Sequence, residues 1–278
     1  MLSETRFVKT LKGHSGCKVE LLQDDETQFV RKISKDASYN VRLETQMKLQ
    51  KGFMRNIGSP KVYRSGHKGD LFFFDMEYIP GANFASSLED IDYPTINNLL
   101  CIIFSELFSR SSDSCNPAIF EMKLIALKSQ LSYNVLYYDV IQRIQPYLLR
   151  IESTTCGHGD LTLENILIND RGTLLYIDFL DSFFHSWKMD CAKLLQDFEL
   201  MWSWRYDRIS VNLAIKIEYC RSLLIDAIER YATPSVFPEI YSLLSLNVLR
   251  ILPYCIDKIT KNWCHSSLEV LLNKISKL

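Results

Sequence analysis

The sequence lacks the features that would place it in a membrane or on nucleic acid. No uninterrupted apolar run reaches the roughly 20 residues that a bilayer-spanning helix needs, and the later apolar stretches are broken by Arg250 and Pro253. The first residues, MLSETR, do not have the basic-then-apolar layout of a secretion signal. The formal net charge of −1 over 278 residues gives no bulk attraction for a polyanion. We therefore expect no transmembrane segment, no nucleic-acid partner and no obligate protein partner.

Cysteine pairs with metal-binding spacing are also absent. The eight cysteines are scattered along the chain without a CxxC pair, and none of the five histidines stands beside a suitable cysteine pair. Scattered single thiols are typical of buried cysteines in a reducing compartment. The composition therefore predicts a cytoplasmic protein without a structural metal.

The composition itself is that of a globular protein, 47% hydrophobic and 23% charged, which is enough for one large core or two adjoining lobes. In its N-terminal part, short β-type runs alternate with turn signals such as Asp24-Asp25-Glu26 and Lys68-Gly69-Asp70. Strands are expected at residues 6–12, 18–22, 29–33, 60–65 and 71–78, and one helix at 40–53. This pattern predicts a small antiparallel sheet with a single helix.

Pro80-Gly81 breaks that pattern, and beyond it the chain becomes helical. Helices are expected at residues 91–110, 117–129, 133–151, 189–204, 210–231, 238–259 and 268–276. In the segment 212–230, apolar residues recur at three- and four-residue intervals, which is typical of an amphipathic helix. One β-hairpin interrupts them, with arms at 166–168 and 174–177 and a turn at 169–172. We therefore predict an α+β protein with a small nucleotide-binding β lobe at 1–79 and a larger helical lobe, for catalysis and acceptor binding, at 80–278.

The residues that carry chemistry lie around this hairpin, in the sequence CGHGDLTLENILINDRGTLLYIDFLD at 156–181. Asp160 precedes Asn165 by five positions, and Asp178 follows Asn165 by thirteen. Phosphoryl transfer needs one carboxylate to orient the attacking hydroxyl and accept its proton, and an asparagine with a second carboxylate to hold Mg²⁺ against the nucleotide phosphates. The spacing therefore predicts a phosphotransferase with Asp160 as its base and Asn165 and Asp178 as its metal ligands.

Two stretches of this sequence resemble known motifs. GHGDLTLENIL at 157–167 and YIDFLD at 176–181 resemble the HGD-x4-N and IDF-x-D motifs of the aminoglycoside phosphotransferase and choline kinase families. The resemblance implies the protein-kinase-like two-lobe fold of those families, with ATP and Mg²⁺ as cofactors and His158 beside Asp160 in the catalytic loop. Asp190, in MDCAKL, matches a later family aspartate at a helix start. It would brace the catalytic loop by hydrogen bonds, or else be a simple N-cap.

The resemblance also assigns side chains in the β lobe. Lys32, in FVRKI, stands on the third expected strand, where the family places the lysine that contacts the nucleotide phosphates. Arg31 and Lys35 compete for this role, and alternation along the strand favours Lys32. Glu44, in the following helix, would pair with Lys32, unless it is an ordinary solvated helix residue.

Two backbone segments complete the expected nucleotide site. In KGHSGCKV at 12–19, Gly13 and Gly16 would let backbone N–H groups approach the phosphates, and Ser15 could donate a further hydrogen bond. The same G-x-x-G turn is also compatible with an ordinary hairpin. MEYIPG at 76–81 resembles the family's hinge, in which backbone groups from Glu77 to Ile79 would meet the adenine edge. The segment is also compatible with an edge strand that ends at Pro-Gly, and both can be true.

Two differences from protein kinases point to a small acceptor. Gly159 replaces the arginine of the HRD triplet, so no cation there can sense a phosphorylated activation loop. Only ten residues separate Asp178 from the helix expected at Met189, and no APE triplet follows. The usual peptide-docking segment is therefore missing. Asp181 has two possible roles, either to assist Mg²⁺ binding or to cap the next helix.

The acceptor can be predicted only as a class. Residues 182–278 carry ten acidic and twelve basic side chains, a net charge of +2, which disfavours a polycationic drug. Trp187, Trp202, Trp204 and Tyr206 would either offer flat faces to a sugar ring or quaternary ammonium, or pack in the core. We predict transfer to a hydroxyl of a sugar, polyol or amino alcohol, in surface-glycan or lipid precursor synthesis. A catalytically weak pseudokinase scaffold and an atypical protein kinase are the alternatives.

Overall fold

The computed structural model of the protein describes residues 5–11, 13, 16–25, 27–53, 57–109, 112–151, 153–155, 157–180 and 182–278. The chain forms two compact units. The first, which we call the sheet unit, contains Met1–Phe84 and Asn165–Asp181, and the second, the helical unit, contains Ala85–Glu164 and Ser182–Leu278. The predicted lobe boundary at 79/80 falls close to the first junction. The hairpin, predicted within the helical lobe, packs instead with the sheet unit, because its strand pairs with residues that directly follow Pro80.

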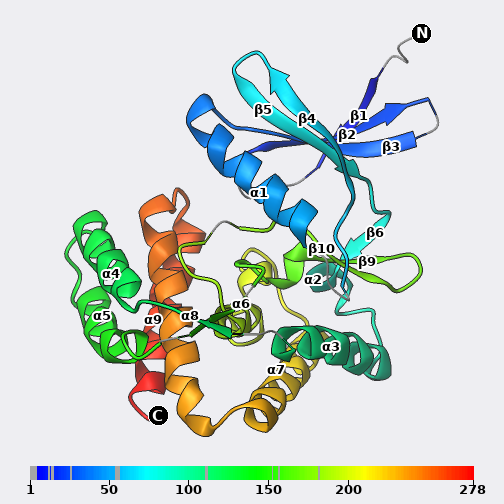
Figure 1. Ribbon diagram of the computed structural model, residues 1–278. Helices are drawn as coiled ribbons and strands as arrows, with labels where there is room; N and C mark the ends of the chain where they lie inside the picture. Colours follow the sequence, from blue (N-terminus) through cyan, green and yellow to red (C-terminus); the bar gives the residue numbers. More distant parts are fainter. Residues whose placement is uncertain are drawn as a thin grey trace. The chain divides into compact units, whose positions relative to one another are not determined.

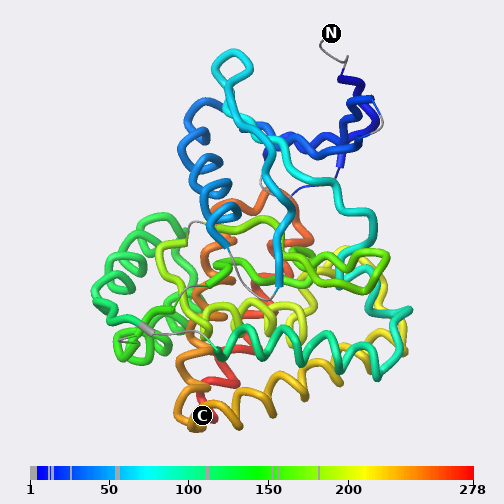
Figure 2. Tube along the Cα trace, turned by 45° about the vertical axis from the view of Figure 1, so that its right-hand side comes forward, coloured from blue at the N-terminus to red at the C-terminus, as the bar shows by residue number. Residues whose placement is uncertain are grey.

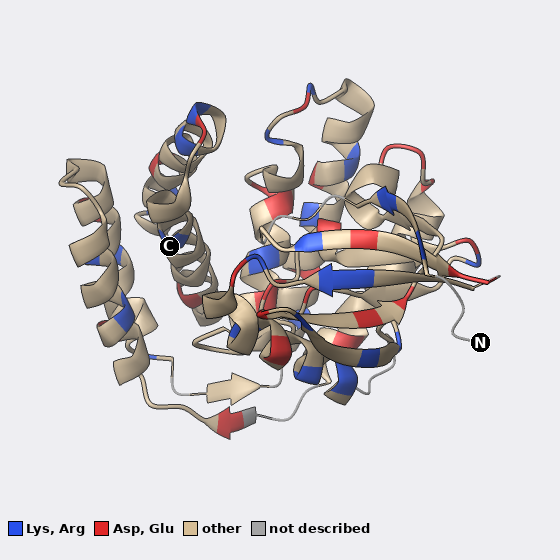
Figure 3. Ribbon diagram, turned by 90° about the horizontal axis from the view of Figure 1, so that it is seen from above, with Lys and Arg blue, Asp and Glu red and all other residues tan. Residues whose placement is uncertain are grey.

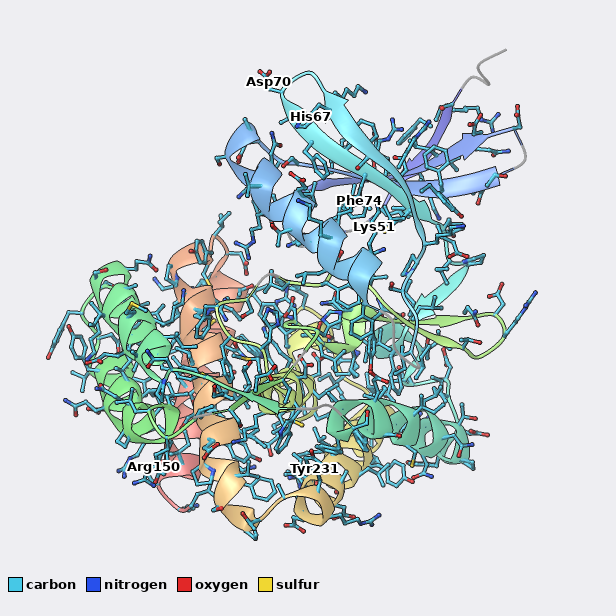
Figure 4. All side chains as sticks on the ribbon, viewed as in Figure 1. Lys51, His67, Asp70, Phe74, Arg150 and Tyr231 are labelled. Atoms are coloured by element: carbon cyan, nitrogen blue, oxygen red, sulfur yellow. The ribbon has the colours of Figure 1, made fainter. Side chains whose placement is uncertain are left out.

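The sheet unit is built on a five-stranded antiparallel sheet in the order β1-β2-β3-β5-β4 (Figure 1). Its strands are β1 (Arg6–Thr10), β2 (Lys18–Asp24), β3 (Thr27–Ile33), β4 (Val62–Lys68) and β5 (Leu71–Glu77). Helix α1 (Asn40–Gly52) packs against β4 and β5. The core between helix and sheet includes Leu43 and Met47 from α1 and Phe74 from β5, the last labelled in Figure 4. The predicted small sheet with one helix is confirmed.

Charged residues of both signs are interspersed along these strands, as the colouring of Figure 3 shows. Arg31 on β3 faces Asp75 on β5 in the strand register and binds it through two parallel hydrogen bonds of 2.7 and 2.8 Å. Arg64 on β4 donates to the same carboxylate at 2.6 Å. Asp75 is almost completely buried, so these two cations supply the partners that a buried carboxylate requires.

A second, three-stranded sheet in the order β10-β9-β6 completes the sheet unit. Strands β9 (Ile166–Asn169) and β10 (Leu174–Tyr176) form the predicted hairpin, and β6 (Gly81–Asn83) pairs with β9. Gly81 has φ of 138°, and a Cβ atom there would lie 2.2 Å from the Ile168 carbonyl oxygen. Only glycine permits this approach, so the predicted chain break at Pro80-Gly81 is also a point of strand pairing.

The helical unit contains the remaining elements. They are α2 (Phe84–Ser87, which begins at the junction), α3 (Tyr93–Phe108), α4 (Ala118–Gln130), α5 (Val135–Leu148), α6 (Trp187–Phe198), α7 (Val211–Tyr231), α8 (Phe237–Ile251), α9 (Lys258–Ile275), and the short strand pair β7 (Ser112–Ser114) and β8 (Ser153–Thr155). Helices α3 and α7 lie side by side (Figure 2). Helix α6 packs against α3, α7 and α8 and is the central helix of this unit, with eleven of its twelve residues buried.

Two of the predicted helices end at least six residues before their predicted ends. The helix predicted at 238–259 stops at Ile251, because Pro253 cannot donate the next backbone hydrogen bond, and α9 then starts behind Asp257, whose carboxylate accepts from Thr260 N–H at 2.7 Å. The helix predicted at 189–204 stops at Phe198, and Met201 adopts a left-handed conformation with φ of 56°.

One helical stretch among the described residues, Pro234–Tyr254, is long and apolar enough to cross a membrane. Of its most apolar window, 67% is buried inside the protein, as expected for the core helix that α8 provides.

Candidate active site

The sheet unit contains an ion pair between a buried lysine and a strained aspartate. Lys32 on β3 has a side chain only 3% exposed, and its Nζ lies 2.7 Å from Asp178 Oδ1. Burial lowers the pKa of Lys32, but the nearby Asp178 carboxylate outweighs it and the pKa is raised. Asp178 has φ of 58°, a left-handed conformation that is uncommon for aspartate. Strained conformations of this kind cluster at functional sites.

The hairpin positions Asp178 relative to Asn165. Ile177 N–H donates to the Asn165 carbonyl oxygen at 3.0 Å, so the backbone next to Asp178 is tied to Asn165. Tyr176 N–H donates to Gly58 O at 2.9 Å and anchors the second arm. The structure therefore brings together three of the predicted site residues, Lys32, Asn165 and Asp178, within one compact unit.

Glu44 does not occupy the predicted position. It is 44% exposed and pairs with Lys48 at 2.8 Å, one turn further along α1, while Lys32 pairs with Asp178. The face of α1 that packs against the sheet carries Leu43, Gln46, Met47 and Gln50. Glu44 lies outside that face because of its helical phase, so the predicted Lys32–Glu44 pair is wrong. Of the competing cations, Arg31 binds Asp75 and Lys35 lies 5.1 Å above the Tyr39 ring.

The predicted phosphate-covering loop connects β1 and β2. Gly16 has φ of 74°, and a Cβ there would meet the Lys35 side chain at 3.3 Å, while one at Gly13 would meet Val19 at 3.2 Å. A positive φ at Gly16 favours glycine at this position. Ser15 lies outside the described residues, as does Asp181.

The predicted hinge has fewer free backbone groups for an adenine than expected, because the Glu77 N–H already has a partner. Glu77 is the last residue of β5, and its N–H donates to the Lys61 carbonyl at 2.8 Å. That N–H is therefore engaged within the sheet. Any backbone recognition of an adenine would have to use the other groups of the segment that runs from Glu77 to Ile79.

In the helical unit, α6 holds the loop at residues 157–163, which the sequence predicts to be the catalytic loop. The Asp190 carboxylate accepts from His158 N–H at 2.9 Å and from Gly159 N–H at 3.1 Å. The N-cap of α6 is Ser186, whose hydroxyl accepts from Lys188 N–H at 3.2 Å. Asp190 is therefore not a simple cap. It is a fully buried brace for the loop.

His158 is also fully buried, and its Nδ1 accepts from Asp160 N–H at 3.3 Å. Gly159 has φ of 82°, which a side chain would resist. This turn explains why glycine stands in the position of the arginine in protein kinases. His158 and Asp190 thus form hydrogen bonds with the backbone around Asp160.

Asp160 is the partly exposed member of the loop, with a side chain 32% exposed. Its Oδ1 lies 3.0 Å from Lys193 Nζ. Burial raises the pKa of Asp160, but the charge and hydrogen bond of Lys193, together with the charge of Arg250, outweigh burial and the pKa is lowered. Asp160 is therefore an ionised carboxylate at neutral pH.

A further aspartate of α6 binds the other end of the loop. Asp197 accepts from Leu163 N–H at 2.6 Å, from Ser203 N–H at 3.0 Å and from the Ser203 hydroxyl at 2.7 Å. Burial raises its pKa to about 7, against the effect of these donors. Asp190, Lys193 and Asp197 are spaced by three and four residues, so they lie on one face of the helix. We call these three residues the loop-facing stripe.

Sequence reasoning identified Asp190 but missed Lys193 and Asp197. In the sequence both look like the polar face of a surface helix, although α6 has almost no surface. The signal that could have found them is their spacing from Asp190, because three charged residues on one face of a helix that follows a catalytic loop are placed to bind that loop.

The aromatic cluster is divided between core and surface. Trp187 and Trp204 are buried, and Trp187 packs edge-on against Phe108 and Tyr231. The Arg205 guanidinium lies 3.7 Å from the Trp202 ring centre and 4.5 Å from that of Tyr206. Of the predicted stacking faces, two are therefore in the core and two already contact Arg205.

Comparison with known proteins supports the fold. No family model matches the sequence, and no curated protein matches it. Aminoglycoside phosphotransferase APH(4)-Ia has a similar structure, with a TM-score of 0.70 and 10% identity over 97% of this chain and 94% of that one. A thermostable mutant of it, in ternary complex with AMP-PNP and hygromycin B, gives 0.67 and 12% over 97% and 94%. Choline kinase LicA from Streptococcus pneumoniae gives 0.63 and 14% over 98% and 95%. The predicted protein-kinase-like α+β fold is confirmed.

Proposed function

We propose that the protein transfers the γ-phosphoryl group of ATP to a hydroxyl group of a small molecule. The observation that carries the proposal is the buried Lys32–Asp178 pair, which lies at a left-handed turn tied by its backbone to Asn165. A buried cation paired with an aspartate in a strained backbone conformation is a combination that clusters at functional sites. The same fold in an enzyme solved with AMP-PNP supports ATP as the phosphoryl donor.

In the proposed reaction, the Asp160 carboxylate accepts the proton of the acceptor hydroxyl. The hydroxyl oxygen forms a bond to the γ-phosphorus, the bond from the γ-phosphorus to the β,γ-bridging oxygen breaks, and ADP leaves. The proton on Asp160 then passes to solvent. The lowered pKa of Asp160 keeps the carboxylate ionised before each turnover.

The donor set of the sheet unit fits Mg²⁺. Asp178 is 35% exposed and Asn165 directly precedes the first arm of the hairpin, so the chain offers a carboxylate and an amide oxygen, the hard donors that Mg²⁺ prefers. Bound Mg²⁺ would neutralise charge on the nucleotide phosphates. Among the described residues no group of three or more His, Cys, Asp and Glu could hold a metal, and Mg²⁺ with a nucleotide needs fewer protein ligands than that.

Other groups of the sheet unit would bind the nucleotide. Lys32 would contact the phosphates, and backbone N–H groups near Gly13 and Gly16 would cover them. The carbonyl of Glu77 and the backbone of Ile79 would meet the adenine edge. Ser15 is proposed here from the sequence pattern alone.

We propose a sugar, polyol or amino alcohol as the acceptor, in a cytoplasmic step of surface-glycan or lipid precursor synthesis. The similar structures belong to an aminoglycoside phosphotransferase and a choline kinase, both named for small molecules. Helix α6 starts at Trp187, soon after Asp178, which leaves no room for a long peptide-docking segment. The net charge of +2 over residues 182–278 argues against a polycationic acceptor.

The test is incubation of the protein with Mg-ATP and a panel of sugars, polyols, choline and ethanolamine, with ADP release as the readout. We expect release that depends on one class of acceptor. Nucleotide binding without acceptor-dependent release from any member would favour a pseudokinase scaffold. Labelled phosphate that appears on protein and never on a small molecule would favour an atypical protein kinase.

A further inference from the structure

A lysine of helix α6 lies directly against the proposed base. Lys193 Nζ is 3.0 Å from Asp160 Oδ1, and the lysine side chain is only 11% exposed. The ammonium also donates to Gln196 Oε1, one turn further along the helix, at 3.2 Å. A buried ammonium must be paired and hydrogen-bonded to be tolerated, and Asp160 supplies the charge of that pair.

Lys193 lies between Asp190 and Asp197 on the face of α6 that contacts the loop. Its neighbours in the loop-facing stripe, Asp190 and Asp197, hold the loop on either side of Asp160 through backbone hydrogen bonds. The loop backbone is therefore fixed by two carboxylates, and Lys193 is the member of the stripe that reaches the side chain of the base.

We propose that Lys193 is a positioning residue for Asp160. Lys193 holds one oxygen of the Asp160 carboxylate, keeps this base ionised, and keeps it in one orientation toward the acceptor hydroxyl. This inference rests on the proposed function, in which Asp160 is the base. Phosphoryl transfer proceeds through a loose transition state that makes little demand on base strength. Orientation of the carboxylate is then the larger contribution, and an ion pair to a rigid buried helix supplies it.

Two further groups lie near Asp160. Arg250 also lowers the pKa of Asp160 through its charge. His158 accepts a hydrogen bond from the Asp160 backbone, and Arg250 lies 4.9 Å above the Phe183 ring and donates to Asn247 at 3.4 Å. Lys193 Nζ forms an ion pair with the Asp160 side chain at 3.0 Å.

The first test measures the ionisation of Asp160 without any acceptor. In protein labelled with ¹³C at aspartate Cγ, the Asp160 signal is identified by its loss in Asp160→Asn and followed against pH. In Lys193→Met, and in the polar but neutral Lys193→Gln, we expect the midpoint to rise by about one pH unit or more, because a partly buried carboxylate loses the cation in contact with it. Lys193→Gln serves if the apolar replacement fails to fold.

Lys188→Met is the matched control. Lys188 lies on the same helix, is 14% exposed and is paired with Glu239. We expect this variant to leave the Asp160 midpoint unchanged. A midpoint in both Lys193 variants within about 0.3 units of the wild type, well below the shift expected for loss of a contacting charge, would overturn the inference.

The second test measures turnover with the acceptor found in the panel, or Mg-ATP hydrolysis by water if none is found. We expect Lys193→Met to lower kcat about 10- to 100-fold with the KM for ATP changed less than about threefold. Lys193→Arg, which keeps the cation, should recover most of the loss. Equal losses in Lys193→Met and Lys188→Met would indicate a structural role and overturn the inference.

The two tests separate the inference from the proposed function. If the Asp160 titration midpoint shifts in the Lys193 variants but the wild type neither phosphorylates an acceptor nor hydrolyses ATP, the ion pair is supported and the phosphotransferase function is refuted. If the wild type is active and Lys193→Met has the same kcat, the phosphotransferase function is supported and the positioning role of Lys193 is refuted.

Discussion

Asp178 has a backbone conformation that costs free energy, of the order of 1 kcal/mol for a non-glycine residue in the left-handed region. The hairpin imposes this conformation through the hydrogen bond from Ile177 to Asn165. Its effect is to aim the carboxylate at Lys32, which would otherwise be a buried charge without that partner. At the scale of single residues, the metal ligand and the phosphate lysine of the proposed site are therefore one coupled unit.

Asp160 and Asp178 should respond differently to the same change. Asp160→Asn should lower kcat by at least about 10²-fold, the scale of a lost general base, and leave nucleotide affinity nearly unchanged. Asp178→Asn should weaken Mg-ATP binding itself, because it removes a metal ligand and leaves Lys32 buried without its anion. Steady-state kinetics and calorimetric titration with Mg-ATP measure both. Near-wild-type turnover in Asp160→Asn would refute its assignment as the base.

Asp197 should make the stability of the protein depend on pH. Its pKa in the folded state is raised to about 7, whereas an aspartate in an unfolded chain titrates near 3.9, so the folded state holds the proton more tightly. The stabilising contribution is fully present below about pH 4 and is lost as the pH rises through about 7, with a slope of at most about 1.4 kcal/mol per pH unit.

Urea unfolding of the wild type and of Asp197→Asn between pH 4.5 and 8 tests this sign. The asparagine does not titrate, so the difference in unfolding free energy between the two proteins should fall as the pH rises. Parallel curves would mean that the three hydrogen-bond donors around Asp197 keep its carboxylate ionised throughout.

At the scale of elements, the sequence predicted what depends on local pattern. Alternation identified the strands and placed Lys32 on the opposite side of β3 from Arg31, and the turn at 169–172 identified the hairpin. Strand β6 was not predicted, because its three residues pair with a strand more than eighty positions away and carry no alternation of their own. Glu44 was misplaced by its phase on α1, which follows from packing against the sheet and not from the sequence of that helix.

The close approach of β6 to β9 gives a stability prediction. Gly81→Ala should destabilise the protein by at least about 3 kcal/mol, because the new methyl group would meet a backbone carbonyl that cannot move away cheaply. Gly69→Ala is the control, since Gly69 also has a positive φ, of 60°, but open space around it. We expect about 1 kcal/mol there, for the conformation alone. Equal losses by urea unfolding would show that the contact with Ile168 relaxes.

At the scale of the whole molecule, the two units are interwoven along the chain. The chain passes from one unit to the other at 84/85, at 164/165 and at 181/182. The second crossing falls between Asp160 and Asn165, so the proposed base belongs to the helical unit and the proposed metal ligand to the sheet unit. Asp160 and Asn165 are therefore only five positions apart in the sequence, although each belongs to a unit with its own core.

The interweaving predicts that the sheet unit cannot fold well from its N-terminal segment alone. A fragment of residues 1–84 lacks the strand that pairs with β6, leaves Lys32 without Asp178, and removes Tyr176 and Phe179 from the Phe53 ring. Loss of the partner of a buried charge costs about 3–5 kcal/mol, which is a large part of the stability of a small domain.

We expect poor dispersion in the ¹H–¹⁵N spectrum of this fragment. A synthetic peptide of residues 165–181 should restore dispersion and raise the melting temperature in a saturable way, while a peptide with Asp178→Asn should do so less. A fragment that is well folded without the peptide would show that the five-stranded sheet and α1 are stable by themselves.

Helix α6 also has a consequence for how this sequence can vary. Eleven of its twelve residues are buried, and the apolar ones fill the core while Asp190, Lys193 and Asp197 bind the catalytic loop. An apolar replacement at Asp190 or Asp197 would leave N–H groups of the loop without an acceptor. A polar replacement at the apolar positions would be buried without partners. In a saturation mutagenesis library, residues 187–198 should therefore be among the least tolerant of the chain. Their mixed, apparently amphipathic composition would be preserved for reasons unrelated to solvent.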